Sequence, residues 1–118
     1  MTAEEAAFRS AVARLLGEPP ETVGSVRREP IVYDAFLAGR DLVRVRGTAT
    51  VRGRHVAWSM VEKRTEGPRT ASPYLVDNGR REAAAYRSGL LADLADGIRA
   101  PRLLAAEDGP DGAITLWL

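Results

Sequence analysis

The sequence predicts an α+β domain, in which an antiparallel sheet of five strands has one helix packed against it and an amphipathic helix precedes it. Three observations support this fold class. Strand-like runs separated by short turns lie on both sides of a helical segment. The first residues place apolar side chains at helical spacing. The length, 118 residues, is typical of a single domain.

The N-terminal helix is predicted from a start signal, a periodic face and a stop signal. Thr2 can cap the helix, and Glu5, three positions later, completes a capping box. The apolar face consists of Phe8, Ala11, Val12, Leu15 and Leu16. Gly17 is a suitable C-terminal cap. We expect this helix to pack on the domain and residues 18–28 to form a linker.

Three strands are expected next, because β-branched and aromatic residues alternate with short turn sequences. The expected strands are residues 31–37, 42–51 and 56–64. The turns between them are residues 38–41, which contain Gly39, and residues 52–54. Such short turns favour an antiparallel meander, in which each strand pairs with the next.

The second half is expected to hold a loop, a helix and two more strands. Residues 66–73 contain Gly and Pro and predict the loop. Asp77 or Asn78 is expected to cap a helix over residues 80–95, which Gly97 would end. The last two strands are expected at residues 101–107 and 113–118, with the turn at 108–112 between them.

Composition excludes several classes of function. The net charge is +1, so no overall field favours nucleic acid or an anionic membrane. The absence of cysteine excludes disulfides, thiolate metal sites and a cysteine nucleophile. No basic and apolar leader opens the chain, and no apolar run approaches the ~20 residues that span a bilayer. We therefore expect a cytoplasmic protein. The single histidine, His55, has no cluster of metal-ligating residues around it in the sequence.

Lys63 is the one lysine of the chain and lies near the end of the third expected strand. Strand alternation places it on the same face as Ser59 and Val61 and places Arg64 on the opposite face. A lysine at the end of a strand is usually solvated, so Lys63 alone is a weak indication of function.

Glu82 falls in the first turn of the second expected helix. Tyr86, Leu90 and Leu94 follow at four-residue steps, so Glu82 lies on or beside the apolar stripe that should face the sheet. One interpretation is a glutamate favoured by the helix dipole. The other is an inward carboxylate, which needs a cationic partner because an unpaired buried charge is costly. Lys63 is the partner we expect, and the competing cations are Arg64 and Arg81.

The pattern of a strand lysine followed by a helix glutamate resembles the small lobe of protein-kinase-like enzymes. The chain is similar to the phosphotransferase enzyme family that includes aminoglycoside phosphotransferases and choline kinases. The similar stretches are residues 39–47, 58–63, 81–91, 100–102 and 116–118. The resemblance covers about residues 29–118, and its more specific part is the Arg-Glu-x-x-x-Tyr stretch with the later Ala-Pro-Arg. It therefore implies a helix and linker over 1–28 and an ATP-binding small lobe over 29–118.

The resemblance also implies roles for single residues. Lys63 would contact the α- and β-phosphates of ATP, and Glu82 would pair with it. Val61 would line the adenine pocket. The turn that contains Gly39 and Arg40 would close over the phosphates. Leu118 would stand just before the hinge that hydrogen-bonds adenine.

The chemistry implied is transfer of the ATP γ-phosphoryl group to a hydroxyl of a small metabolite or aminoglycoside-like acceptor. In this family the catalytic residues and the Mg²⁺ ligands lie in a large lobe. No catalytic residue is therefore expected within these 118 residues, which end in a strongly apolar strand, and we expect the isolated chain to be inactive. The large lobe is the expected partner; no membrane is expected.

Two alternatives remain open. One is a non-catalytic β-meander module that binds nucleic acid or protein through Arg44, Arg46, Arg52 and Arg54. Nucleic acid is the weaker option, because aromatic residues are not interleaved there and the net charge is near zero. The other alternative is a kinase-like lobe in a protein that has lost catalysis.

Overall fold

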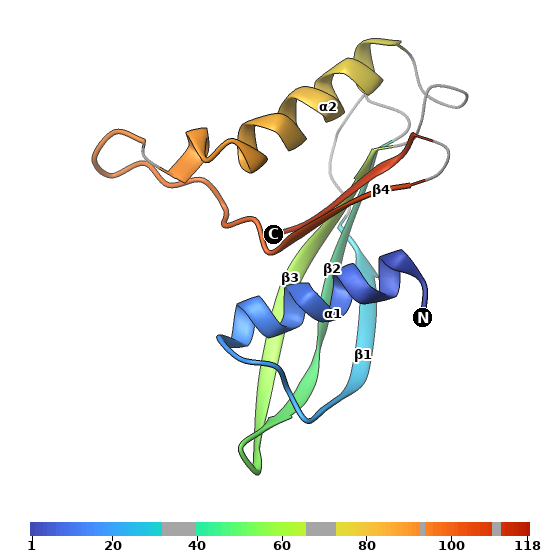
Figure 1. Ribbon diagram of the computed structural model, residues 1–118, viewed down its shortest axis with the longest axis vertical. Helices are drawn as coiled ribbons and strands as arrows, with labels where there is room; N and C mark the ends of the chain where they lie inside the picture. Colours follow the sequence, from blue (N-terminus) through green and yellow to red (C-terminus); the bar gives the residue numbers. More distant parts are fainter. Residues whose placement is uncertain (32–39, 66–72, 93, 110–111) are drawn as a thin grey trace.

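A computed structural model describes residues 1–31, 40–65, 73–92, 94–109 and 112–118. The fold is α+β, with an antiparallel five-stranded sheet and two helices, as predicted (Figure 1). The elements are α1 (Ala3–Leu16), β1 (Thr22–Pro30), β2 (Arg40–Val51), β3 (Arg54–Thr65), α2 (Pro73–Arg87), a short 3₁₀ helix η1 (Leu90–Ala92), β4 (Ala105–Asp108) and β5 (Ile114–Trp117).

The sheet has the strand order β1-β2-β3-β5-β4, and every neighbouring pair is antiparallel. Strands β1, β2 and β3 form an antiparallel meander; β2 and β3 are the predicted second and third strands, whereas β1 does not coincide with the first strand predicted at 31–37. Arg52 and Gly53 both have a positive φ at the turn between β2 and β3, which confirms the predicted tight turn. The β2–β3 hairpin is twelve residues long on each side and projects beyond the rest of the sheet (Figure 1).

Helix α1 has the start, the face and the stop that the sequence predicts. The Thr2 hydroxyl accepts the Glu5 amide hydrogen, and the Glu5 carboxylate accepts that of Thr2. Gly17 takes the left-handed conformation at the C-terminal end, with φ of 85°. Ala11 and Val12 are fully buried against the sheet.

The prediction of a linker over residues 18–28 is wrong, because most of β1 lies there. This strand is at the edge of the sheet, and only Val23 among its nine residues is partly buried. A polar edge strand lacks the apolar alternation by which strands are recognised, and charged residues are typical of such edges. Of the strand predicted at 31–37, Ile31 follows β1 and donates its amide hydrogen to Leu42, and the rest lies outside the described residues.

Helix α2 is displaced toward the N-terminus by comparison with the prediction. It begins at Pro73 and continues through Asp77 and Asn78, which were expected to cap it. Proline suits the first position of a helix, because its missing N–H has no helical acceptor there. The predicted end at Gly97 is also wrong. The helix ends at Arg87, and Gly89 then adopts a left-handed φ of 79°.

The last two strands are shorter than predicted. The fourth covers Ala105–Asp108 instead of 101–107, and the fifth covers Ile114–Trp117 within the expected 113–118. Between them, the amide of Gly109 donates to the carbonyl of Ala113, which closes the expected turn. All four residues of β5 are buried, because this strand lies between β3 and β4 with a helix over each face.

The two helices cover opposite faces of the sheet, which we name the α1 face and the α2 face. On the α1 face, Val45, Trp58, Met60 and Trp117 form the larger core with α1. On the α2 face, Ala83 of α2 forms a smaller core with Ile114 and Leu116 of β5. Figure 1 shows that α1 crosses the middle of the sheet, whereas α2 lies at the end remote from the β2–β3 turn.

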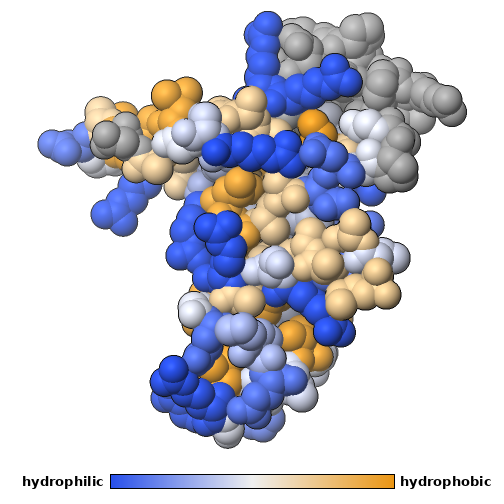
Figure 2. Space-filling view, viewed as in Figure 1, coloured by the Kyte–Doolittle hydropathy of each residue, from blue (hydrophilic) through white to orange (hydrophobic). Residues whose placement is uncertain are grey.

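The outer end of the α2–η1 region carries exposed apolar side chains, as Figure 2 shows. Leu90, Leu94 and Ile98 are exposed in fractions of 68%, 38% and 60%. The predicted inward stripe therefore holds at Tyr86 but not at Leu90 or Leu94, because the helix has ended before them.

Neither helix in the described part of the chain has the length and the apolar composition that crossing a membrane requires.

A prediction about packing arises at Gly47, which lies opposite Trp58 in the β2–β3 pair. A Cβ atom there would lie 2.8 Å from Cζ2 of Trp58 and 2.9 Å from the carbonyl oxygen of Gly24. We expect Gly47→Val to lower the free energy of unfolding by about 1–3 kcal/mol or more, the range for overpacked sites. Urea unfolding measures this change. The control is Gly24→Ala, where the nearest atom is 3.9 Å away; equal effects would contradict the packing explanation.

Candidate functional site

Lys63 and Glu82 form an ion pair that joins β3 to α2. Nζ of Lys63 donates to Oε1 of Glu82 over 2.7 Å. The two side chains are 20% and 24% exposed, so the pair is neither fully buried nor freely solvated. The contact predicted from the sequence is therefore present. Its role in nucleotide binding stays a prediction.

Each element places its partner for a local reason. Lys63 is held in register by Leu42 of β2 on one side and Leu116 of β5 on the other. Helix α2 is fixed on this face by Ala83, which is 2% exposed and belongs to the cluster of Ile114 and Leu116. Because Glu82 is next to Ala83 in the helix, its carboxylate lies at the edge of the contact between the helix and the sheet.

The sequence predicts Glu82 in the first turn of its helix, and this prediction is wrong. Helix α2 begins nine residues earlier, at Pro73, and its first turn contains no acidic residue. The favourable dipole effect acts within the first turn, so it does not explain this glutamate. The inward position beside Lys63 is the explanation that the geometry supports.

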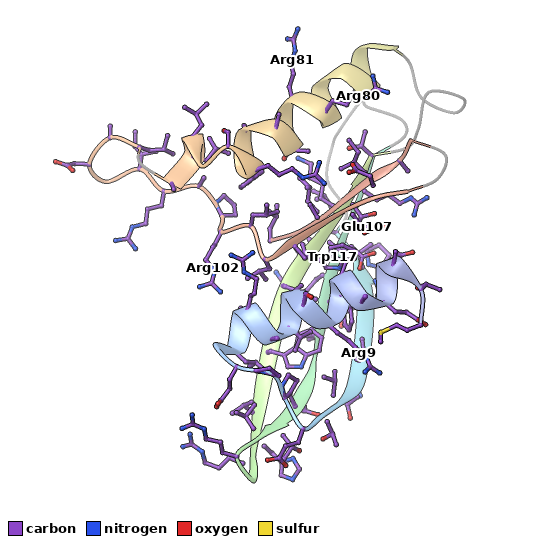
Figure 3. All side chains as sticks on the ribbon, viewed as in Figure 1. Arg9, Arg80, Arg81, Arg102, Glu107 and Trp117 are labelled. Atoms are coloured by element: carbon purple, nitrogen blue, oxygen red, sulfur yellow. The ribbon has the colours of Figure 1, made fainter. Side chains whose placement is uncertain are left out.

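Neither competing cation replaces Lys63. Arg64 is the next residue of β3, and its register partner Thr115 lies on the α1 face, as alternation predicts. It lines a surface hollow there with Glu4 and Glu107. Arg81 of α2 points away from the sheet, as Figure 3 shows. Lys63 is thus the cation that meets Glu82.

Val61 and Leu118, the two residues predicted to border adenine, lie side by side. The amide of Val61 donates to the carbonyl of Leu118 over 2.9 Å, and the reverse bond measures 2.8 Å. Both side chains are partly exposed and share the α2 face with Lys63, because Lys63 and Leu116 are register partners two residues away. A partly apolar edge therefore adjoins the ammonium group along one face of the sheet.

The remaining predicted residues are placed less completely. Gly39 lies outside the described residues. Arg40 was expected in a turn with Asp41, but the backbone of both belongs to β2, where they pair with Thr65 and Arg64. The strand is longer than its apolar run, because the ladder with β3 continues to the end of that strand. The turn predicted over residues 38–41 therefore does not include Arg40 and Asp41, and its other two residues lie outside the described part of the chain.

Tyr86 lies one helical turn after Glu82 and shows the electrostatic effect of the site. Burial, and then the negative charge of Glu82, raise the pKa of the Tyr86 hydroxyl above its ordinary value. Both causes favour the neutral phenol. The sequence placed Tyr86 on the inward stripe but gave no indication of this coupling.

We expect Glu82→Gln to lower the pKa of Tyr86 toward, but not to, the value of a free tyrosine. The charge effect is removed, whereas the effect of burial remains. An absorbance titration of the phenolate measures this pKa in a background with Tyr33 and Tyr74 replaced by phenylalanine. Glu107→Gln, on β4, is the control. An unchanged pKa in Glu82→Gln would show that the carboxylate does not act on Tyr86.

The arginine stripe considered as an alternative site is divided in the structure. Arg44 and Arg46 share the α2 face of β2. Arg52 lies at the hairpin turn, and its Nε donates to Glu18 over 3.0 Å. Arg54 begins β3 beyond that turn. The four side chains therefore do not form one continuous row.

Sequence reasoning missed two charged residues that join Arg44 and Arg46. Arg27 stands opposite Arg46, and Glu29 stands opposite Arg44 and forms an ion pair with Arg46. Arg27 falls in the segment predicted as a linker, residues 18–28, and Glu29 falls between that segment and the strand predicted at 31–37. The polar alternation of Arg27 and Glu29 is the signal that could have indicated a shared strand face.

Among the described residues, no group of three or more His, Asp or Glu side chains could hold a metal ion. Comparison of the chain with protein-family models, with curated proteins and with solved structures gives no match in any of the three.

Proposed function

We propose that this chain is the ATP-binding small lobe of a small-molecule phosphotransferase, with Lys63 as its phosphate-contacting residue. The observation that carries the proposal is the 2.7 Å contact between Lys63 and Glu82 across β3 and α2. A strand lysine oriented by a helix glutamate is the device by which kinase-like enzymes hold nucleotide phosphates. The resemblance of residues 29–118 to the aminoglycoside phosphotransferase and choline kinase family supports the same function.

The ammonium group of Lys63 suits a phosphate ligand. It has three N–H donors and no acceptor, and Glu82 takes one of the three. Glu82 also holds the Lys63 side chain in one direction before the ligand arrives. Less rotamer freedom of the lysine is then lost when a phosphate binds. Val61 and Leu118 offer an apolar border on the same face, where the adenine base would lie.

The rest of the reaction is assigned to a second, catalytic lobe. ATP supplies the γ-phosphoryl group, and the acceptor is a hydroxyl of a small metabolite or aminoglycoside-like molecule. The second lobe would hold Mg²⁺ and the carboxylate that positions the acceptor. The described residues of this chain then have one task, which is to hold and orient the nucleotide.

An amine-reactive adenosine analogue tests the proposal directly. Lys63 is the one lysine of the chain, so the α-amino group of Met1 is the other amine available to such a reagent. With a sulfonyl fluoride attached to adenosine, we expect modification at Lys63 that excess ATP suppresses. The control reagent is a sulfonyl fluoride without adenosine. Modification of Lys63 that ATP does not suppress, or that matches the α-amino group in extent, would defeat the proposal.

A further inference from the structure

Three arginines gather on the open part of the α2 face, away from α2. Arg27 of β1 and Arg46 of β2 are directly opposite in the register, and Arg44 is two residues from Arg46 on the same face. Opposite residues have Cβ atoms about 5 Å apart, and residues two apart on one strand are separated by about 7 Å. The three guanidinium groups can therefore converge on one small ligand.

The charges of this cluster are unbalanced. Glu29 is opposite Arg44 and forms an ion pair with Arg46. Within the part of the chain that the structure describes, no ion pair within 4 Å is found for Arg27 or Arg44. Three positive charges thus meet one negative charge. Like charges directly opposite in a sheet destabilise it, so the Arg27–Arg46 pair opposes folding in the absence of an anion.

The backbone next to the cluster is also unusual. The β1–β2 register shifts between Gly24 and Arg27, which is a β-bulge, and Ser25 within it has a φ of 52°. A positive φ at a residue other than glycine is strained, and such strain and bulges occur preferentially beside functional sites. The bulge brings Ser25 to a surface hollow that Thr48, Ser59 and the three arginines also line. The Thr48 hydroxyl already donates to the carbonyl of Gly24, which leaves the serine hydroxyls and the guanidinium groups as the donors that could bind phosphate oxygens.

We propose that Arg27, Arg44 and Arg46, with the neighbouring Ser25, form an anion site that binds a phosphate or diphosphate group of a small molecule. This inference goes beyond the proposed function and does not rest on it, because Lys63 lies elsewhere on the face. Arg46 is opposite Ser59, four residues from Lys63 along β3, which is about 13 Å. Arg44 is opposite Val61, so the arginine cluster adjoins the apolar border of the proposed nucleotide site without including Lys63.

The compactness of the cluster favours a small dianion over a nucleic-acid strand. Nucleic acid carries repeated phosphates and is bound by cations that follow its path over several nucleotides. Here the next arginine along the hairpin, Arg52, is paired with Glu18. Three arginines within one small area match a single phosphate group, which guanidinium groups bind with paired hydrogen bonds.

Glu29 should compete with the ligand for Arg46. Its carboxylate is fixed by that arginine, and the charges of Arg44 and Arg27 also favour its ionised form, so its pKa is lowered. An incoming dianion would meet this negative charge and would have to displace it from Arg46. Removing the charge of Glu29 should therefore strengthen anion binding, whereas removing an arginine should weaken it.

Calorimetric titration of the 118-residue chain with inorganic pyrophosphate at constant ionic strength tests the site. We expect Arg27→Gln and Arg46→Gln each to weaken binding by about 10- to 100-fold, as for the loss of one hydrogen bond to a charged group. Glu29→Gln should tighten binding. Arg54→Gln removes the same charge at the far end of the hairpin and should leave affinity unchanged. Circular dichroism of each variant confirms that it is folded.

Three outcomes would overturn the proposal. Affinity could be insensitive to Arg27 and Arg46, or Lys63→Met could abolish pyrophosphate binding and so assign the anion to the nucleotide site. A single-stranded oligonucleotide could bind through these arginines while pyrophosphate does not. Inorganic phosphate and phenyl phosphate separate the two possible sources of the ligand. Tighter binding of the ester supports a phosphorylated molecule, and equal binding supports free phosphate; both support the site.

Discussion

Replacing Lys63 by methionine is expected to weaken ATP binding by about 10- to 100-fold. Hydrogen bonds to charged groups contribute about 1.5–3 kcal/mol, and each 1.4 kcal/mol is tenfold in affinity. The loss of stability should be smaller than that of a core deletion, because Glu82, left without its partner, is 24% exposed and can still be hydrated. Titration calorimetry gives the dissociation constant, and urea unfolding gives the stability.

Two further variants make this expectation specific. Glu82→Gln keeps the lysine but removes the charge that orients it, so its effect on ATP affinity should be smaller than that of Lys63→Met. Arg54→Gln removes one positive charge from an exposed position nine residues away on β3 and should have no effect. Equal losses in Lys63→Met and Arg54→Gln would mean that ATP responds to net charge alone.

The largest effect on stability is expected from Trp117→Ala. Trp117 of β5 is fully buried, and Figure 3 shows it between the sheet and α1. Its removal leaves a cavity in the larger core, where Val12 and Val45 are also fully buried. Replacement of a buried tryptophan by alanine costs about 3–5 kcal/mol, a large part of the stability of a typical domain. Urea unfolding followed by circular dichroism measures this loss.

Trp117→Phe separates packing from hydrogen bonding. Nε1 of Trp117 is buried and has no hydrogen-bond partner among the described residues. Phenylalanine keeps an aromatic ring and removes that unpaired donor, whose burial carries a cost. We therefore expect Trp117→Phe to cost clearly less than Trp117→Ala. The surface control Leu90→Ala, at a side chain that is 68% exposed, should change stability by less than about 0.5 kcal/mol. A phenylalanine variant as unstable as the alanine variant would refute this explanation.

The elements that sequence reasoning predicted best carry their own local signals. Helix α1 has a capping box at one end and Gly17 at the other, so the local sequence predicts both of its ends. Strands β2 and β3 are long, rich in β-branched residues and joined at Gly53, where φ is positive. In these segments, local preference and tertiary structure agree.

The errors lie where tertiary pairing decides the structure. Strand β1 is polar because it is an edge strand, and its pairing with β2, not its composition, makes it a strand. Helix α2 includes Asp77, Asn78 and Gly79, which are residues with low helix propensity. Packing of its later residues, Ala83 above all, on Ile114 and Leu116 offsets that preference.

The candidate site was predicted in part for the same reason. The contact between Lys63 and Glu82 followed from strand alternation and helix periodicity, which are short-range patterns. The arginine cluster was not foreseen as a whole, because Arg27 reaches Arg46 only through the β1–β2 register. Cross-strand neighbours depend on that register, and the sequence of a polar edge strand specifies it weakly.

Nuclear magnetic resonance of the single lysine tests the central proposal most directly. Lysine labelled with ¹³C at Cε gives one side-chain signal, because Lys63 is the only lysine of the chain. If Lys63 contacts the nucleotide phosphates, this signal will shift in a saturable manner on titration with ATP, and adenosine will cause a much smaller shift. A lysine signal that stays unchanged at ATP concentrations that saturate the chain would contradict the assignment of Lys63 to the phosphate site.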